Sequence, residues 1–62
     1  MKVKITNTTD HKFEGSIIEF NGEIDDLFLS ENIHIELIEV IIHENTIKLI
    51  SDNYIVDGEI EE

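Results

Sequence analysis

The chain has 62 residues and a formal charge of −11, because fifteen carboxylates face only four lysines when the three histidines are taken as neutral. It contains no cysteine, which excludes a disulfide scaffold, a cysteine-based zinc site and a cysteine nucleophile. A surface of this sign repels phosphate, so direct nucleic-acid binding is not expected. No apolar run reaches the roughly 18 residues of a membrane span and the N-terminus lacks the apolar core of a signal peptide, so we expect no membrane partner and a cytoplasmic location.

Branched side chains dominate the apolar residues. Of 25 apolar residues 13 are isoleucine, and isoleucine, valine and threonine together supply 20 residues. Their stiff χ1 angles suit a pleated strand better than a helix. The composition therefore predicts an all-β fold: a small antiparallel meander or a strongly bent SH3-like barrel of about five strands, with room for one short helical turn. We expect a single domain over residues 1–58 and a frayed acidic C-terminal tail over residues 59–62.

The first half of the chain shows two strands and a strong turn signal. Residues 2–6 alternate between polar and apolar, which places Val3 and Ile5 on one face. The composition of residues 7–10 indicates a turn, and a second strand is predicted over residues 11–20. Asn21-Gly22 then favours a two-residue type I′ hairpin, since that turn needs positive φ at both positions.

Residues 24–29 are ambiguous. Asp25 and Asp26 could cap a single helical turn over residues 27–29, or the segment could be the return strand of the hairpin. The preceding Asn21-Gly22 favours the strand.

Residues 33–43 change their apolar phase in mid-run, from odd positions up to Leu37 to even positions from Ile38 onward. Such a change is typical of a bulge or bend, which lets a sheet curl towards a barrel. A similar change occurs between Ile17 and Ile18. The competing interpretation is a short helix over residues 36–43, where apolar residues also recur at helical spacing.

The last part of the chain alternates turns and short strands. Residues 44–45 form a predicted turn, followed by a strand over residues 46–50 and a turn over residues 51–53. A final short strand is predicted over residues 54–56, ended by Asp57-Gly58.

Small size and high charge argue that the fold needs a second copy. A chain near 60 residues buries only about 60% of its unfolded surface. Repulsion among the carboxylates lowers its stability further. Neither a disulfide nor a metal site is available to stabilise the fold, so we expect a homodimer. Exposed aromatic and branched side chains are the expected contact residues. The expected dimer contacts are Phe28, Ile41 and Tyr54.

The charge is unevenly distributed along the chain. Residues 1–13 carry a net +2, and residues 14–62 carry −13. A magnitude of roughly 2–8 suffices for the solubility of a small domain, so the excess favours a negative surface shaped for a basic partner. A surface that only solubilises the protein is the alternative. The residues expected to bind the partner are Glu23, Asp25, Asp26, Glu36 and Glu39.

Catalytic and metal chemistry are not indicated. Adjacent acids such as Asp25-Asp26 are expected by chance among so many carboxylates, and the chain is too short to build a deep cleft. We therefore expect no enzyme and no catalytic residues. The spacing of His11, His34 and His43 matches no zinc motif, and neither a calcium loop nor a glycine-rich phosphate loop is present. No metal or cofactor is expected.

A very small chain that is rich in isoleucine and asparagine, strongly acidic and without cysteine or proline resembles the small phage-encoded proteins that inhibit bacterial defence systems, including DNA mimics. The resemblance covers size, composition and charge. It implies a non-catalytic, homodimeric inhibitor that binds a basic host protein, such as a defence nuclease or helicase complex, in the cytoplasm of a bacterial host. Two alternatives stay open: a small structural or assembly adaptor that uses its isoleucine-rich surface, and an immunity protein or antitoxin.

Overall fold

A computed structural model describes residues 1–61 and shows six strands in that span. The strands are β1 (Lys2–Thr8), β2 (Ile17–Glu19), β3 (Asp26–Ser30), β4 (Ile33–His43), β5 (Thr46–Ser51) and β6 (Ile55–Glu61). The predicted all-β fold is confirmed, with six strands in place of about five. Residues 26–30 and 33–43 are strands, so the helical alternatives for residues 27–29 and 36–43 are wrong, while residues 24–25 belong to the connection before β3. No helix in the described part of the chain is long and apolar enough to cross a membrane.

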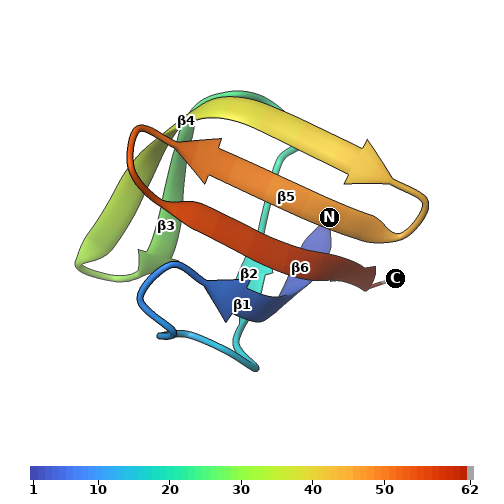
Figure 1. Ribbon diagram of the computed structural model, residues 1–62, viewed down its shortest axis with the longest axis horizontal. Helices are drawn as coiled ribbons and strands as arrows, with labels where there is room; N and C mark the ends of the chain where they lie inside the picture. Colours follow the sequence, from blue (N-terminus) through green and yellow to red (C-terminus); the bar gives the residue numbers. More distant parts are fainter. Residues whose placement is uncertain (62) are drawn as a thin grey trace.

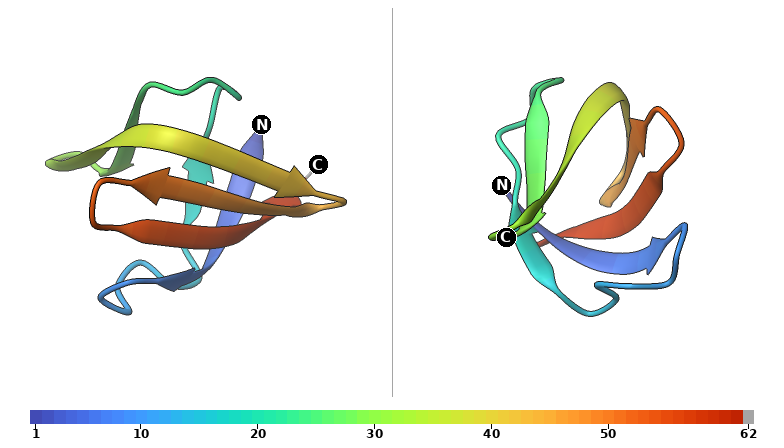
Figure 2. Two further views of the ribbon diagram at one scale, coloured as in Figure 1. Left: turned by 45° about the horizontal axis from the view of Figure 1, so that its top comes forward. Right: turned by 90° about the vertical axis from the view of Figure 1, so that its left-hand side faces the viewer.

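The six strands form one antiparallel sheet in the order β2-β1-β6-β5-β4-β3. The sheet curls strongly, so that its two edge strands, β2 and β3, both lie behind β5 and β6 in Figure 1. The right-hand view of Figure 2 shows the resulting barrel-like outline, which no hydrogen-bonded pair of β2 and β3 closes. The curl follows from the right-handed twist of strands and from three register shifts, in the β1–β6, β3–β4 and β4–β5 pairs.

The interior of the curled sheet is filled by branched and aromatic side chains. Every strand contributes at least one of them, at alternate positions. The ten buried apolar residues are Val3, Ile5, Ile18, Phe20, Leu27, Leu29, Leu37, Ile47, Leu49 and Val56. The predicted pairing of Val3 and Ile5 on one face is therefore confirmed.

The bulge predicted in residues 33–43 is present in β4. The register with β5 shifts between Leu37 and Glu39, which leaves Ile38 as the extra residue. Leu37 is buried before the bulge, and the half-buried Val40 packs on the core after it. The change of apolar phase in the sequence is thus the signature of one inserted residue.

The second predicted strand is mostly a loop. Only residues 17–19 pair with β1, and His11, Phe13 and Gly15 adopt positive φ angles of 59°, 67° and 87°. This loop is tied down by the buried Thr8 hydroxyl oxygen, which accepts a hydrogen bond from the Lys12 N–H at 2.8 Å. Three left-handed residues in five positions fold the chain back on itself, so a continuous strand over residues 11–20 cannot form.

The predicted Asn21-Gly22 hairpin is also wrong. Only Gly22 has a positive φ, and the Asn21 side chain accepts the N–H of Glu23 at 2.9 Å instead of leading into a ladder. β2 pairs with β1 and β3 pairs with β4, so residues 20–25 connect the two opposite edges of the sheet. An Asn-Gly pair specifies a turn locally, but it does not specify which strands that turn joins.

The end of the chain is more ordered than expected. β6 runs through Glu61, with Glu59 between Lys4 of β1 and Thr46 of β5, so residues 59–61 are strand and not a frayed tail. Residue 62 lies outside the described residues. Asp57-Gly58 does not end the strand either. Gly58 is needed there for space, because a Cβ at this position would lie 2.5 Å from Val3 Cγ1 and 2.8 Å from the carbonyl oxygen of Lys4.

We expect Gly58→Ala to destabilise the fold by about 2 kcal/mol or more, because the added methyl group meets backbone on β1 that cannot move freely. Chemical denaturation measures the change in the free energy of unfolding. The matched control is Glu59→Ala at the adjacent exposed position, which should change stability by less than about 0.5 kcal/mol. Equal effects of the two substitutions would contradict the close approach of β6 to β1.

Candidate functional site: an acidic face on β3 and β4

Three of the four lysines lie on β1 and β5, the fourth, Lys12, lies in the loop after β1, and none lies on β3 or β4. Lys2 lies opposite Glu19 on β2 and Glu61 on β6, and Lys4 lies opposite Glu59. On β5, Lys48 Nζ is 3.6 Å from Asp57 Oδ1. Residues 21–44, by contrast, contain seven carboxylates and no lysine or arginine. The lysines on β1 and β5 therefore offset acids of β2 and β6, and none lies within the segment that builds β3 and β4.

Three of the five predicted partner-binding residues lie together where β3 begins. Asp26 and Glu36 are directly opposite each other across the β3–β4 pair. The carbonyl oxygen of Asp25 accepts the N–H of Leu37 at 3.2 Å, which fixes this residue beside the same point of β4. The Asp25 carboxylate also accepts the N–H of Asp26 at 2.8 Å. Like charges directly opposite in a sheet destabilise it, so this arrangement costs stability.

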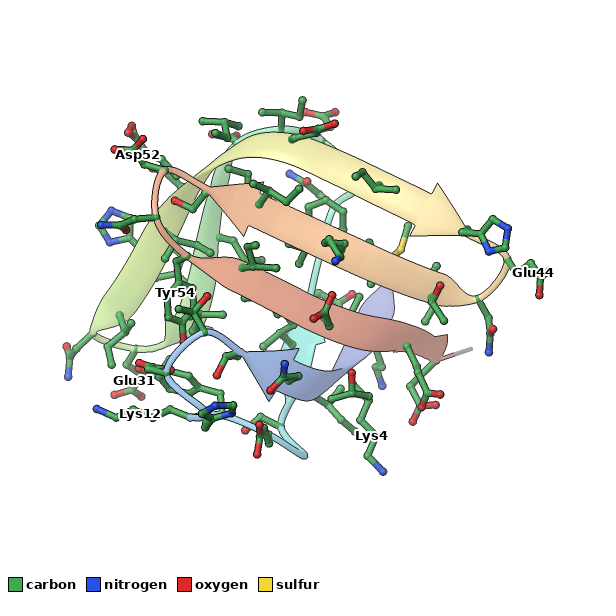
Figure 3. All side chains as sticks on the ribbon, viewed as in Figure 1. Lys4, Lys12, Glu31, Glu44, Asp52 and Tyr54 are labelled. Atoms are coloured by element: carbon green, nitrogen blue, oxygen red, sulfur yellow. The ribbon has the colours of Figure 1, made fainter. Side chains whose placement is uncertain are left out.

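The other two predicted residues extend this cluster in two directions. Glu23 is exposed in the connection that leads to β3, and Glu39 follows the bulge on β4, opposite Ile50. None of the five carboxylates forms an ion pair within residues 1–61. Figure 3 shows Lys4 and Lys12 on the β1 side of the molecule, with Asp52 and Glu44 at hairpin tips away from them. We call Glu23, Asp25, Asp26, Glu36 and Glu39 the acidic face.

Sequence reasoning missed an aromatic pair within the acidic face. Phe28 and His34 are cross-strand neighbours whose ring centroids are 5.3 Å apart, and the Phe28 side chain is 60% exposed. They lie two positions along the ladder from Asp26 and Glu36, so the same outer face carries both pairs. The sequence contains the signal for this pair, because Phe28 lies between Leu27 and Leu29 in a strand. When the two leucines face the core, the ring between them faces outward. A basic partner docking here would therefore meet an apolar contact surface beside the carboxylates.

The three predicted dimer contacts do not form one surface. Phe28 lies on the acidic face, while Ile41 is exposed on β4 seven residues beyond His34, roughly 20 Å away along the strand. Tyr54 is half-buried and packs against the core. Its hydroxyl donates to the Asp10 carboxylate at 2.6 Å, so this ring holds the loop after β1 in place.

The Tyr54–Asp10 hydrogen bond changes the acidity of both groups. Donation from Tyr54 lowers the pKa of Asp10 below its ordinary value of 3.8, with further help from the Lys12 backbone and the Thr8 side chain. Burial of the ring raises the pKa of Tyr54 above 10.0, and the bond to Asp10 raises it further. The bond is therefore strongest where Asp10 is ionised and Tyr54 is neutral.

A shallow hollow of about 340 Å³ opens on the outer side of β4, β5 and β6. It includes the Lys48–Asp57 ion pair, with Ile41 and His43 along one side. A single solvent-exposed ion pair does not supply a general acid or a general base, because each of its two groups is engaged by the other. Within residues 1–61, no three histidine or carboxylate side chains converge as a metal site would require.

Comparison with known proteins gives no relative: no protein-family model, no curated protein and no solved structure matches this chain.

We expect the stabilising effect of the Tyr54 hydroxyl to have a defined pH window. A lowered Asp10 pKa contributes stability that is present above 3.8 and is lost as the pH falls through the folded-state pKa. A raised Tyr54 pKa contributes stability that is present below 10.0 and is lost as the pH rises through its folded-state value. Tyr54→Phe should therefore lower the melting temperature most near neutral pH, and the difference from the parent should shrink in acid and in alkali.

Thermal unfolding across this pH range measures the window, with the exposed Asp52→Asn as the control for general charge effects. A difference between Tyr54→Phe and the parent that is independent of pH would show that the hydroxyl does not act through Asp10.

We expect removal of the like-charge pair to stabilise the protein. Asp26→Asn or Glu36→Gln should each raise the free energy of unfolding by about 0.5 kcal/mol, because either change ends the cross-strand repulsion. The double variant should gain less than the sum, since both changes remove the same interaction. Denaturation at low and high salt measures this. Glu44→Gln, at a hairpin tip, is the control and should have little effect.

Proposed function

We propose that this chain is a non-enzymatic binding protein that inhibits a basic, nucleic-acid-binding target, with the acidic face as its contact surface. The observation that carries the proposal is the pairing of Asp26 with Glu36, beside Asp25, on a part of the sheet without a lysine. A folded protein gains nothing from opposed carboxylates, whereas a bound cationic partner turns their repulsion into attraction.

The physical basis is mimicry of a nucleic-acid backbone by side chains. Carboxylates on an extended strand pair present a row of negative charges, much as a duplex presents phosphates. They attract a cationic groove at long range and occupy it without base contacts. The exposed Phe28 beside Asp26 and Glu36 adds apolar contact area at one end of the face. Together with the resemblance to phage-encoded inhibitors, this favours a bacterial defence nuclease or helicase as the target, in the host cytoplasm.

A structural or assembly adaptor is the second candidate. It is favoured by one observation, the exposure of many large apolar side chains on the surface of the protein: Met1, Ile17, Ile24, Phe28, Ile33, Ile38, Ile41, Ile42 and Ile55. Contacts made through such residues hold or tighten with added salt, whereas contacts through carboxylates weaken. An immunity protein or antitoxin would use the same electrostatics as the inhibitor and differ only in its partner.

The inhibitor proposal is tested by competition for a nucleic-acid-binding groove. A defence nuclease of the host is bound to a fluorescent duplex, and the protein is titrated in at increasing salt. We expect displacement of the duplex, and an inhibition constant that weakens at least about tenfold between low and high salt. Displacement that is insensitive to salt would favour the adaptor, and no displacement of any basic target would remove the proposal.

The choice of face is tested with two quadruple variants of equal charge change. The first neutralises Asp25, Asp26, Glu36 and Glu39 as Asn or Gln. The second neutralises Glu14, Glu19, Glu59 and Glu61, each of which has a cationic or histidine neighbour. We expect the first variant to lose at least about a hundredfold in affinity, at roughly 0.7–1 kcal/mol per contact, and the second to lose much less. Equal losses would show that net charge alone acts.

A further inference from the structure

β4 is longer than either of its neighbours, and this leaves part of its edge without a strand. β3 pairs with its first part, up to Glu36, and β5 pairs with its second part, from Leu37 to His43. On the β3 side the last backbone contact is the Leu37 N–H, which donates to Asp25. Beyond it, residues 38–43 have no strand beside them on that side within the described chain.

The register of the β4–β5 hairpin determines which backbone groups face this free edge. His43 and Thr46 flank a two-residue turn, so they exchange hydrogen bonds with each other. Hydrogen-bonded positions alternate along an antiparallel pair, so Ile41 and Glu39 also bond to β5. Val40 and Ile42 therefore direct their N–H and C=O groups away from β5, where no backbone partner exists in residues 1–61.

This free edge lacks the features that normally protect an edge strand. Natural edges are blunted by lysine, proline or charge. Here Ile38, Ile41 and Ile42 are 60%, 45% and 49% exposed, and Glu39 is the one charged carboxylate between residues 38 and 43. In a chain of charge −11, a segment with a single carboxylate adds little repulsion between two copies.

The arrangement of residues on this edge is self-complementary in one register. A twofold antiparallel pair must place Val40 and Ile42 against each other or against themselves, because only these positions offer backbone groups to the edge. A twofold axis centred on Ile41 places Val40 of each copy opposite Ile42 of the other. All four of the free N–H and C=O pairs then form hydrogen bonds between the copies. The same axis also sets Glu39 opposite His43 twice, and an imidazole N–H donates to a carboxylate in either protonation state. A register centred on Val40 places Glu39 opposite Ile41, and one centred on Ile42 places Glu39 opposite Asn45. Both lose the Glu39–His43 pair.

We propose that two copies of this chain associate through the free edge of β4, in an antiparallel register centred on Ile41. The two curled sheets then continue into each other across the pair of β4 strands. The interface shares only Glu39 with the acidic face and does not include Glu23, Asp25, Asp26 or Glu36. It follows from the strand register without reference to the proposed function.

A single introduced cysteine tests the register, because the chain has none of its own. In the proposed register the two Ile41 positions form a non-hydrogen-bonded pair with Cα atoms about 4.5 Å apart, which suits a disulfide. Ile41→Cys should therefore yield a covalent dimer under mild oxidation. Ile42→Cys, at a position of similar exposure, is the matched control. Its two copies would lie about 8 Å apart, beyond disulfide reach, and should stay mostly uncrosslinked.

Sedimentation of the unmodified protein at micromolar concentration tests the association itself. We expect a dimer mass, and tighter association at molar salt because the repulsion between the acidic chains is screened. Ile42→Pro should give a monomer that still folds, since the proline removes an N–H that faces the edge and not β5. A monomeric parent protein, or cross-linking of Ile42→Cys in preference to Ile41→Cys, would overturn the proposal.

Discussion

The bulge at Ile38 is the constraint on which the rest of this structure depends. One extra residue in β4 moves the inward phase from odd to even positions and lets one strand serve β3 before it and β5 after it. Without it, Leu37 and Val40 could not both face the core. The bend separates the β3–β4 hairpin from the rest of the ladder, so the sheet curls around a small core. It also ends the pairing with β3 halfway along β4, which creates the free edge.

The distribution of charge over this fold has a physical logic. The lysines of β1 and β5 lie beside carboxylates of β2 and β6, so that half of the sheet is close to balanced. The β3–β4 half carries its acids without compensation and even opposes two of them across a strand pair. A small domain has little stability to spare, and under the proposed function a bound cationic partner relieves this repulsion.

The two proposed surfaces use different forces and meet on β4 at Glu39. Four residues of the acidic face come before the bulge, beside an aromatic pair, and Glu39 follows it at the start of the free edge, where isoleucine and backbone groups dominate. Salt weakens the first kind of contact and strengthens the second. A dimer formed along the edge would carry two acidic faces on one particle. Such a particle could engage a basic target at two points, which raises its effective affinity without a new contact.

The sequence by itself determined the β class, through branched residues and alternation, and it located the bulge through the change of apolar phase at Ile38. It also determined the negative sign of the surface charge and the absence of lysine between residues 21 and 44. The tertiary structure alone decided which strands are neighbours: that Asn21-Gly22 joins two sheet edges, that Glu59 belongs to a strand beside Lys4, and that Asp26 faces Glu36. The reason is that alternation fixes which side of a strand a residue faces. The partner across the ladder depends on contacts distant in sequence, which no local pattern encodes.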